Sequence, residues 1–101
     1  MKIWVDDIRP APDGYFWCQS VNETKEIIEM AETLFEQPYI YIIDLDYDAG
    51  DYEKDGGPYI KLMDWLVERG TLYPLAFHSQ NCVGMEYMKR MYRRYWLGES
   101  L

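Results

Sequence analysis

Four short apolar runs punctuate the chain, and each gives way to polar residues. Runs of this length, rich in β-branched and aromatic residues, are typical of buried strands. Between them lie longer stretches whose apolar residues recur every three or four positions, as on one face of a helix. The pattern predicts strands at 2–5, 15–18, 39–43 and 74–77, and helices at 20–36, at 58–69 and from about 81 onwards.

The order of these elements, β-β-α-β-α-β-α, predicts an α/β fold. We expect a small three-layer α/β/α sandwich around a mostly parallel, four-stranded sheet. With 101 residues, and no internal repeat, linker or low-complexity stretch, residues 1–101 are expected to form a single domain around one core. Only a loop separates the first two runs, so a parallel arrangement requires that loop to replace the usual crossover helix.

Acidic residues gather where two of the predicted strands end. Asp6 and Asp7 follow the first run, and Asp44, Asp46 and Asp48 follow the third. Ligands of parallel α/β sheets bind just beyond the carboxyl ends of the strands, so these clusters predict a shared pocket. Carboxylates packed together need protonation, screening or a cation, and Mg²⁺ favours such oxygen ligands. The alternative is that several of these acids are helix caps, turn formers or partners of a nearby arginine.

A second set of polar side chains follows the fourth strand. His78 is the only histidine, and its ordinary pKa lies near neutrality. At a strand end it would act as a general acid or base or hydrogen-bond a phosphate; otherwise it is structural. Ser79 and Asn81 would either contact a phosphate oxygen or cap the last helix, and the two roles are compatible. Arg9 would neutralise the neighbouring acids or reach a phosphate through its guanidinium fork.

The charge and composition of the chain limit the kinds of partner that we expect it to bind. The formal net charge of −8 marks an acidic protein and disfavours duplex DNA and anionic membranes. Residues 86–101 are net basic, so this end is either a solvated helix face or a surface for a phosphate or an acidic partner. No run approaches the roughly 18 apolar residues of a membrane span. Two cysteines without metal-ligand spacing, and no signal peptide, lead us to expect a cytoplasmic location.

Two segments resemble a known family. Segment 3–12, IWVDDIRPAP, and segment 78–84, HSQNCVG, are similar to the opening and late motifs of the cyclic-phosphate processing receiver domains, which are related to response-regulator receivers. The resemblance spans nearly the whole chain. It implies a receiver-like (flavodoxin-like) fold and action on the cyclic phosphate ends of nucleotides or RNA. By position, the matching residues are Asp6, Asp7, Asp46, Asp48, His78, Ser79 and Asn81.

The chain departs from the family pattern at position 47, where Tyr47 replaces a histidine. A phenol is a poor base at neutral pH, so a mechanism that uses two histidines loses one of them. The first hypothesis is therefore a metal-dependent phosphoesterase (a hydrolase) or binder, with His78 and Asp46 catalytic. In it Ser79, Asn81, Arg9 and Tyr47 contact the substrate, and Asp6, Asp7, Asp46 and Asp48 hold Mg²⁺.

Two other functions remain open from the sequence. The first is a non-catalytic module that binds a protein partner, such as a bacterial or phage accessory protein, with a degenerate site. Tyr47 and the surplus of tyrosines favour it. The second is signalling through phosphorylation of Asp46, which ranks lowest because the chain has no lysine after a fifth strand, as ordinary receivers have.

Overall fold

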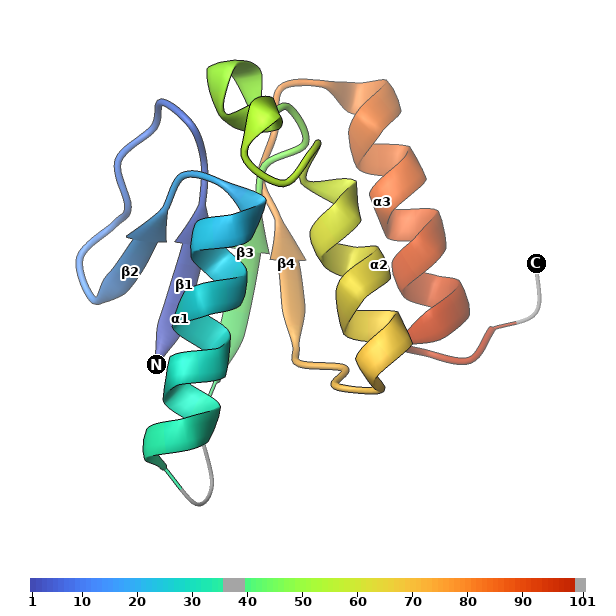
Figure 1. The fold of residues 1–101 in the computed structure, drawn as a ribbon. Coiled ribbons are helices and arrows are strands. Elements are labelled where there is room, and N and C mark those ends of the chain that lie inside the picture. Colours follow the sequence, from blue (N-terminus) through green and yellow to red (C-terminus); the bar gives the residue numbers. More distant parts are fainter. Residues whose placement is uncertain (36–39, 100–101) are drawn as a thin grey trace.

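The fold is described from a computed structural model, which covers residues 1–35 and 40–99 (Figure 1). Four strands and three α-helices alternate in the predicted order, with one added 3₁₀ helix. The strands are β1 (Lys2–Val5), β2 (Tyr15–Cys18), β3 (Ile42–Leu45) and β4 (Leu75–Phe77). The helices are α1 (Val21–Leu34), η1 (Gly50–Lys54), α2 (Ile60–Arg69) and α3 (Cys82–Tyr95).

All four strands are parallel, in the order β2-β1-β3-β4. Val5 pairs with Cys18 on one side and with Leu45 on the other, and Leu45 pairs with Phe77. This register aligns the carboxyl ends of the strands at one edge of the sheet. The predicted α/β fold with a parallel sheet of four strands is confirmed.

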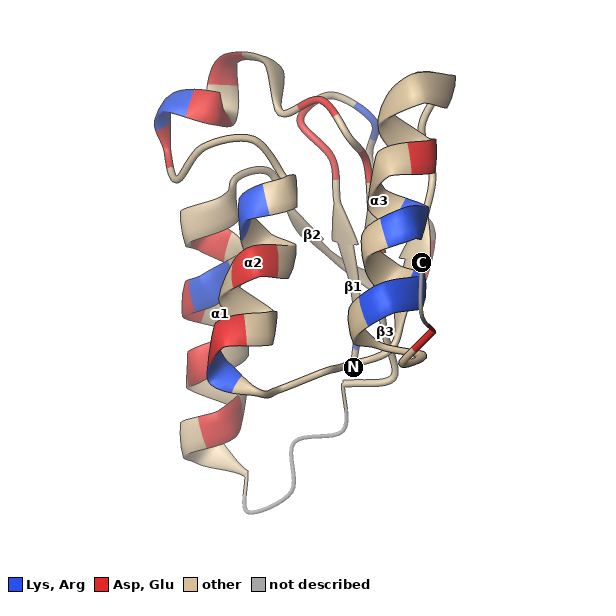
Figure 2. Ribbon diagram, turned by 90° about the vertical axis from the view of Figure 1, so that its right-hand side faces the viewer, with Lys and Arg blue, Asp and Glu red and all other residues tan. Residues whose placement is uncertain are grey.

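The helices are distributed unevenly around the sheet. α1 and α2 lie side by side over one face, whereas α3 lies along the β4 side of the sheet (Figures 1 and 2). Alternate strand residues point toward the helices and are buried there, because successive side chains of a strand face opposite ways. The resulting core includes Ile3, Val5, Ile43, Leu45, Val21, Ile28, Leu62, Leu66 and Met88.

The loop between β1 and β2 takes the place of a crossover helix, as the sequence requires. Two tryptophans of the sheet donate hydrogen bonds to the backbone of this loop. The Trp4 indole N–H donates to the Arg9 carbonyl oxygen at 2.9 Å, and the Trp17 indole N–H donates to the Asp6 carbonyl oxygen at 2.7 Å. Indoles bury well only when the N–H finds an acceptor, and the loop backbone supplies two. These hydrogen bonds fix the conformation of the loop where it leaves β1, at the carboxyl ends of the strands.

Helix caps follow the sequence signals. The Ser20 hydroxyl accepts the Glu23 N–H and caps α1, and Asn81 accepts the Gly84 N–H and caps α3. Gly70 ends α2 in the left-handed region at φ 71°, a conformation that glycine adopts without strain. The loop between β3 and α2 contains η1, and Asp55 at the end of η1 accepts hydrogen bonds from Ser20 and Asn22. None of the helices in the described part of the chain could span a membrane.

The bounds of the third strand were predicted wrongly. The strand begins at Ile42 and continues through Asp44 to Leu45, rather than covering 39–43; position 39 lies outside the described residues. Asp44 was expected to follow the strand, and a carboxylate within a parallel sheet is costly to bury unless it has a partner. Here Asp44 has a partner, His78, that stabilises its charge. The fourth strand is shorter than predicted by one residue, since it begins at Leu75.

Candidate functional site

Three neighbouring strand ends bring polar side chains together. Asp6 follows β1, Asp46 follows β3 and His78 follows β4, and these strands are adjacent in the sheet. One ligand-type atom from each of the three residues lies within 4.8 Å of the others. This convergence is what the parallel topology predicts, and it places a histidine ring among carboxylates at the edge where ligands of such sheets bind.

His78 lies between two carboxylates. Its Nδ1 is 2.7 Å from the Asp44 Oδ1, and its Nε2 is 2.9 Å from the Asp6 Oδ2. The ring stacks on the Trp4 indole, with centroids 3.6 Å apart and planes 6° from parallel. Both nitrogens can donate only in the imidazolium form, which the indole face also favours. The surroundings of His78 therefore suit a positive charge.

Asp6 is the most enclosed acid of the site, with 2% of its surface exposed. Its Oδ1 accepts the backbone N–H groups of Ile8 at 2.9 Å and Arg9 at 2.7 Å, and its Oδ2 faces His78. Burial raises the pKa of Asp6, but these two N–H donors and His78 outweigh it and hold the pKa below its usual value. These contacts stabilise the ionised form of Asp6, which joins the β1–β2 loop to His78 at the end of β4.

The ionisation of His78 follows from the same contacts. Burial lowers the pKa of His78, whereas the hydrogen bonds and negative charges of Asp44 and Asp6 raise it, and the net pKa lies above the ordinary 6.5. A histidine whose pKa is higher in the folded state stabilises the fold fully below the unfolded pKa. That contribution disappears as the pH rises through the folded pKa.

We expect His78 to titrate above pH 6.5 in the folded protein, and its charge to stabilise the fold at mildly acidic pH. Because the chain has one histidine, its imidazole resonances in a ¹³C or ¹⁵N NMR titration need no assignment. With chelator present, Asp44→Asn should move the midpoint back toward 6.5. A midpoint below 6.5 in the wild type would show that burial, rather than the two carboxylates, controls the ring.

The pKa values of Asp7 and Asp46 are shifted upward, in the opposite direction to that of Asp6. Burial is the main cause that raises the pKa of Asp46, and the charge of Asp6 adds to it; hydrogen bonds from the Ser79 hydroxyl and the Tyr47 N–H oppose the rise. Burial also raises the pKa of Asp7, together with the charges of Asp6 and Asp46. These carboxylates repel one another in the folded state. A bound cation would relieve that repulsion, so the donor set fits a divalent metal.

The predicted metal ligands separate into two groups. Asp6 and Asp46 converge with His78, and the Asp7 carboxylate lies near them, against Gly50 at the start of η1. Asp48 is exposed and accepts a hydrogen bond from the Asn81 amide at 3.3 Å, away from the convergent group. A metal role for each of these four acids remains a prediction.

The other predicted contact residues take defined positions. Ser79 lies between Asp46, to which its hydroxyl is hydrogen-bonded, and Asn81, whose N–H it accepts at 3.1 Å. Asn81 caps α3, the alternative that the sequence had left open. Arg9 contributes its backbone to Asp6 and Trp4, and no ion pair among the described residues involves its guanidinium. Its side chain is exposed at the loop beside the pocket edge.

Tyr47, the residue that departs from the family pattern, packs against α3. Its ring lies over Gly84, so closely that a Cβ atom at Gly84 would overlap the ring carbons. Gly84 is buried in the first turn of α3. The tyrosine is thus half-buried, and its position depends on a glycine on the neighbouring element.

We expect Gly84→Ala to destabilise the domain by about 1–3 kcal/mol, because the added methyl group must push the Tyr47 ring away. Thermal unfolding would measure the change. Val83→Ala is the matched control, since Val83 is the preceding helix residue and is 82% exposed. If Gly84→Ala were as stable as this control, the ring would not be fixed against α3.

Asp44 and Trp4 are site residues whose roles the sequence did not indicate. Asp44 was expected in the acidic cluster that follows the third strand, although it lies within β3, and Trp4 had no predicted role at the site. The register pairs Trp4 with Asp44, and Asp44 with Ala76, so these residues share the face of the sheet that His78 approaches. Side chains alternate between the two faces of a strand, so correct bounds for β3 would have placed Asp44 on the same face as Trp4.

The fold and site together define a receiver-like α/β domain with an acidic pocket at the carboxyl edge of its sheet. A family model, the cyclic-phosphate processing receiver domain, matches residues 1–94. The chain therefore belongs to that family. No curated protein and no solved structure matches it at a significant level.

Proposed function

We propose that this domain binds the cyclic phosphate end of a nucleotide or RNA with the help of a divalent cation, Mg²⁺, and hydrolyses it. The observation that carries the proposal is the convergence of Asp6, Asp46 and His78 in a member of a cyclic-phosphate processing family. Two carboxylates suit a hard cation, and the positive ring beside them suits a phosphate.

Each side chain has a distinct task in this proposal. Asp6 and Asp46, with Asp7 beside them, would hold the cation, which would supply neutralisation of charge on the phosphate oxygens. Ser79 and the N-terminus of α3 would receive the phosphate, because a helix N-terminus favours anions. The Arg9 guanidinium, exposed in the loop after β1, and Tyr47 would contact the rest of the ligand.

Hydrolysis of a cyclic phosphate needs one proton acceptor and one proton donor. Water attacks phosphorus and forms the new P–O bond while the bond to one ribose oxygen breaks. Asp46 would take the proton from the water. His78, held as imidazolium by Asp44 through Nδ1, would give the Nε2 proton, which Asp6 now accepts, to the departing ribose oxygen once that oxygen replaces the Asp6 contact.

A turnover assay tests this proposal. Incubation with adenosine 2′,3′-cyclic phosphate and Mg²⁺ should yield adenosine monophosphate. His78→Gln should slow the reaction about 10²-fold or more, because the proton donor is lost. Asp13→Asn, at an exposed position in the β1–β2 loop, is the control and should leave the rate unchanged. An inactive wild type that still binds the cyclic nucleotide would limit the domain to recognition.

The alternative function is a non-catalytic module that binds a protein partner through a degenerate site. The observation that favours it is Tyr47, which stands where the family has a histidine and packs on Gly84. Under this alternative Tyr47→His would create turnover in an inactive protein. Under the first proposal it would only increase a rate that is already measurable. Chromatographic detection of the linear product distinguishes the two.

A further inference from the structure

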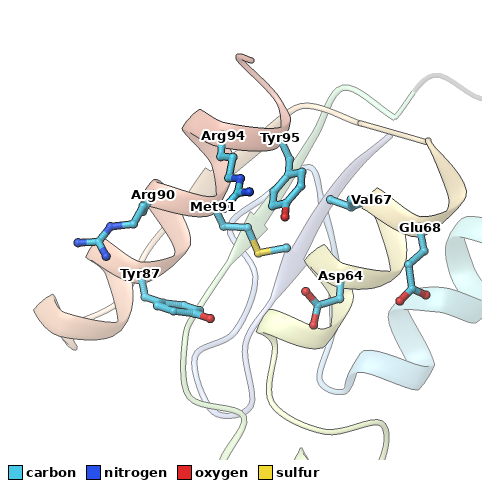
Figure 3. Close-up of a pocket in the computed structure, with 8 residues that line it drawn as sticks. All are labelled: Asp64, Val67, Glu68, Tyr87, Arg90, Met91, Arg94 and Tyr95. Atoms are coloured by element: carbon cyan, nitrogen blue, oxygen red, sulfur yellow. The ribbon is translucent and has the colours of Figure 1, made fainter. Parts of the chain in front are cut away.

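A groove between α2 and α3, remote from the acidic pocket, has an unusual distribution of charge (Figure 3). Its volume is about 400 Å³. One wall carries Asp64 and Glu68 from α2, and the other carries Arg90 and Arg94 from α3. Both pairs are spaced by four residues, so each forms a row along its helix. Figure 2 shows the acidic bands of α2 and the basic bands of α3 on adjacent helices.

The two rows do not neutralise each other within the chain. The ion pairs of the described residues include none between the acids of α2 and the arginines of α3. Asp64 has only a long contact of 4.0 Å to Lys61 on its own helix, and the Arg94 guanidinium lies over the Tyr95 ring at 5.3 Å. Both rows therefore retain charges that another molecule can pair with.

The floor and rim of the groove are apolar or aromatic. Val67 and Met91 line it, and Tyr87 and Tyr95 stand at its rim with 57% and 44% of their surfaces exposed. Tyrosine and methionine flanked by arginine are typical of protein interfaces. The surface thus combines an apolar centre with two opposite rows of charge.

From this charge pattern we infer that the groove is the interface of a homodimer. α2 and α3 run in the same direction, each from the carboxyl edge of the sheet back toward the opposite edge (Figure 1). A twofold axis parallel to the groove places α2 of one copy over α3 of the other. Each acidic row then faces the partner's arginine row, and the apolar residues meet at the centre of four parallel helices.

A twofold axis across the groove instead places like charges opposite each other, so the pattern selects one of the two arrangements. Complementary rows of this kind fit a second copy of this chain, because each row finds its counterpart without any other molecule. The carboxyl edge of the sheet, with its acidic pocket, stays open in each copy. The inference is independent of the proposed activity.

Paired charge-reversal variants test the dimer. Sedimentation equilibrium of the wild type should show a monomer–dimer equilibrium. Arg90→Glu with Arg94→Glu makes both rows acidic, and Asp64→Arg with Glu68→Arg makes both rows basic. Each double variant alone should be monomeric, and an equimolar mixture of the two should form heterodimers. Circular dichroism should confirm that both variants fold.

Three results would overturn the inference. They are a wild type that stays monomeric at its highest soluble concentration, a dimer that survives both charge reversals, and a mixture of the variants that remains monomeric. A wild-type monomer that captures an unrelated helical peptide would instead assign the groove to another partner. Binding of cyclic nucleotide by the monomeric variants would show that the interface and the acidic pocket act separately.

Discussion

Asp6→Ala should destabilise the domain more than any other single change at the pocket edge, by about 3–5 kcal/mol. The Asp6 carboxylate accepts two backbone N–H groups and faces His78, and almost none of it is exposed to water. Its removal leaves the Ile8 and Arg9 N–H groups without that acceptor and a positive ring with one carboxylate fewer. In a domain of this size the melting temperature should fall by more than about 10 °C.

Two further substitutions test whether the loss of stability comes from the charge and the burial of Asp6. Asp6→Asn keeps one oxygen for the backbone donors and loses the charge, so we expect an intermediate loss. Asp13→Ala, in the exposed part of the same loop, should change stability by less than about 0.5 kcal/mol. If Asp6→Ala unfolded at the same temperature as Asp13→Ala, the hydrogen bonds around Asp6 would contribute little to the fold.

Asp46→Asn should abolish the stabilisation of the domain by Mg²⁺. A cation that binds only the folded state at about 100 times its dissociation constant adds about 2.7 kcal/mol to the free energy of unfolding. Asp46 supplies one of the two convergent carboxylates, and an amide is a weaker ligand for this ion. Thermal unfolding with and without Mg²⁺ measures the difference.

In chelator, the same substitution should raise the stability of the domain, by about 0.5–2 kcal/mol. The cause is the unfavourable surroundings that raise the pKa of Asp46, namely burial and the charge of Asp6. Asp51→Asn, on the exposed surface of η1, should alter neither quantity. A full Mg²⁺ response in Asp46→Asn would contradict the assignment of Asp46 as a ligand.

The parts of the fold that the sequence predicted best depend on local signals. Ser20, Gly70 and Asn81 mark helix ends through hydrogen bonds and backbone conformations that need no tertiary partner. The convergence of Asp6, Asp46 and His78 followed from the parallel order of the strands alone. The capping signals relate residues that are a few positions apart in the sequence. The parallel strand order relates distant residues, because it brings the carboxyl ends of the strands to one edge of the sheet.

The parts that escaped prediction depend on contacts between distant residues. Asp44 can lie inside β3 because His78, 34 residues later, approaches its carboxylate. The stacking of His78 on Trp4 joins the end of β4 to β1 and has no local signature in the sequence. The groove between α2 and α3 could not be predicted from the sequence for a similar reason. Each helix alone shows only ordinary charges on a solvated face, and the groove requires both helices.

The most direct test of the central claim is an isothermal titration with adenosine 2′,3′-cyclic phosphate in the presence of Mg²⁺. We predict a heat that saturates with ligand concentration in the wild type, whether from binding or from turnover, and its loss in folded Asp46→Asn and His78→Gln, with Asp51→Asn unchanged. No saturable heat in the wild type, or equal heats in the wild type and both site variants, would contradict a cyclic-phosphate site formed by Asp6, Asp46 and His78.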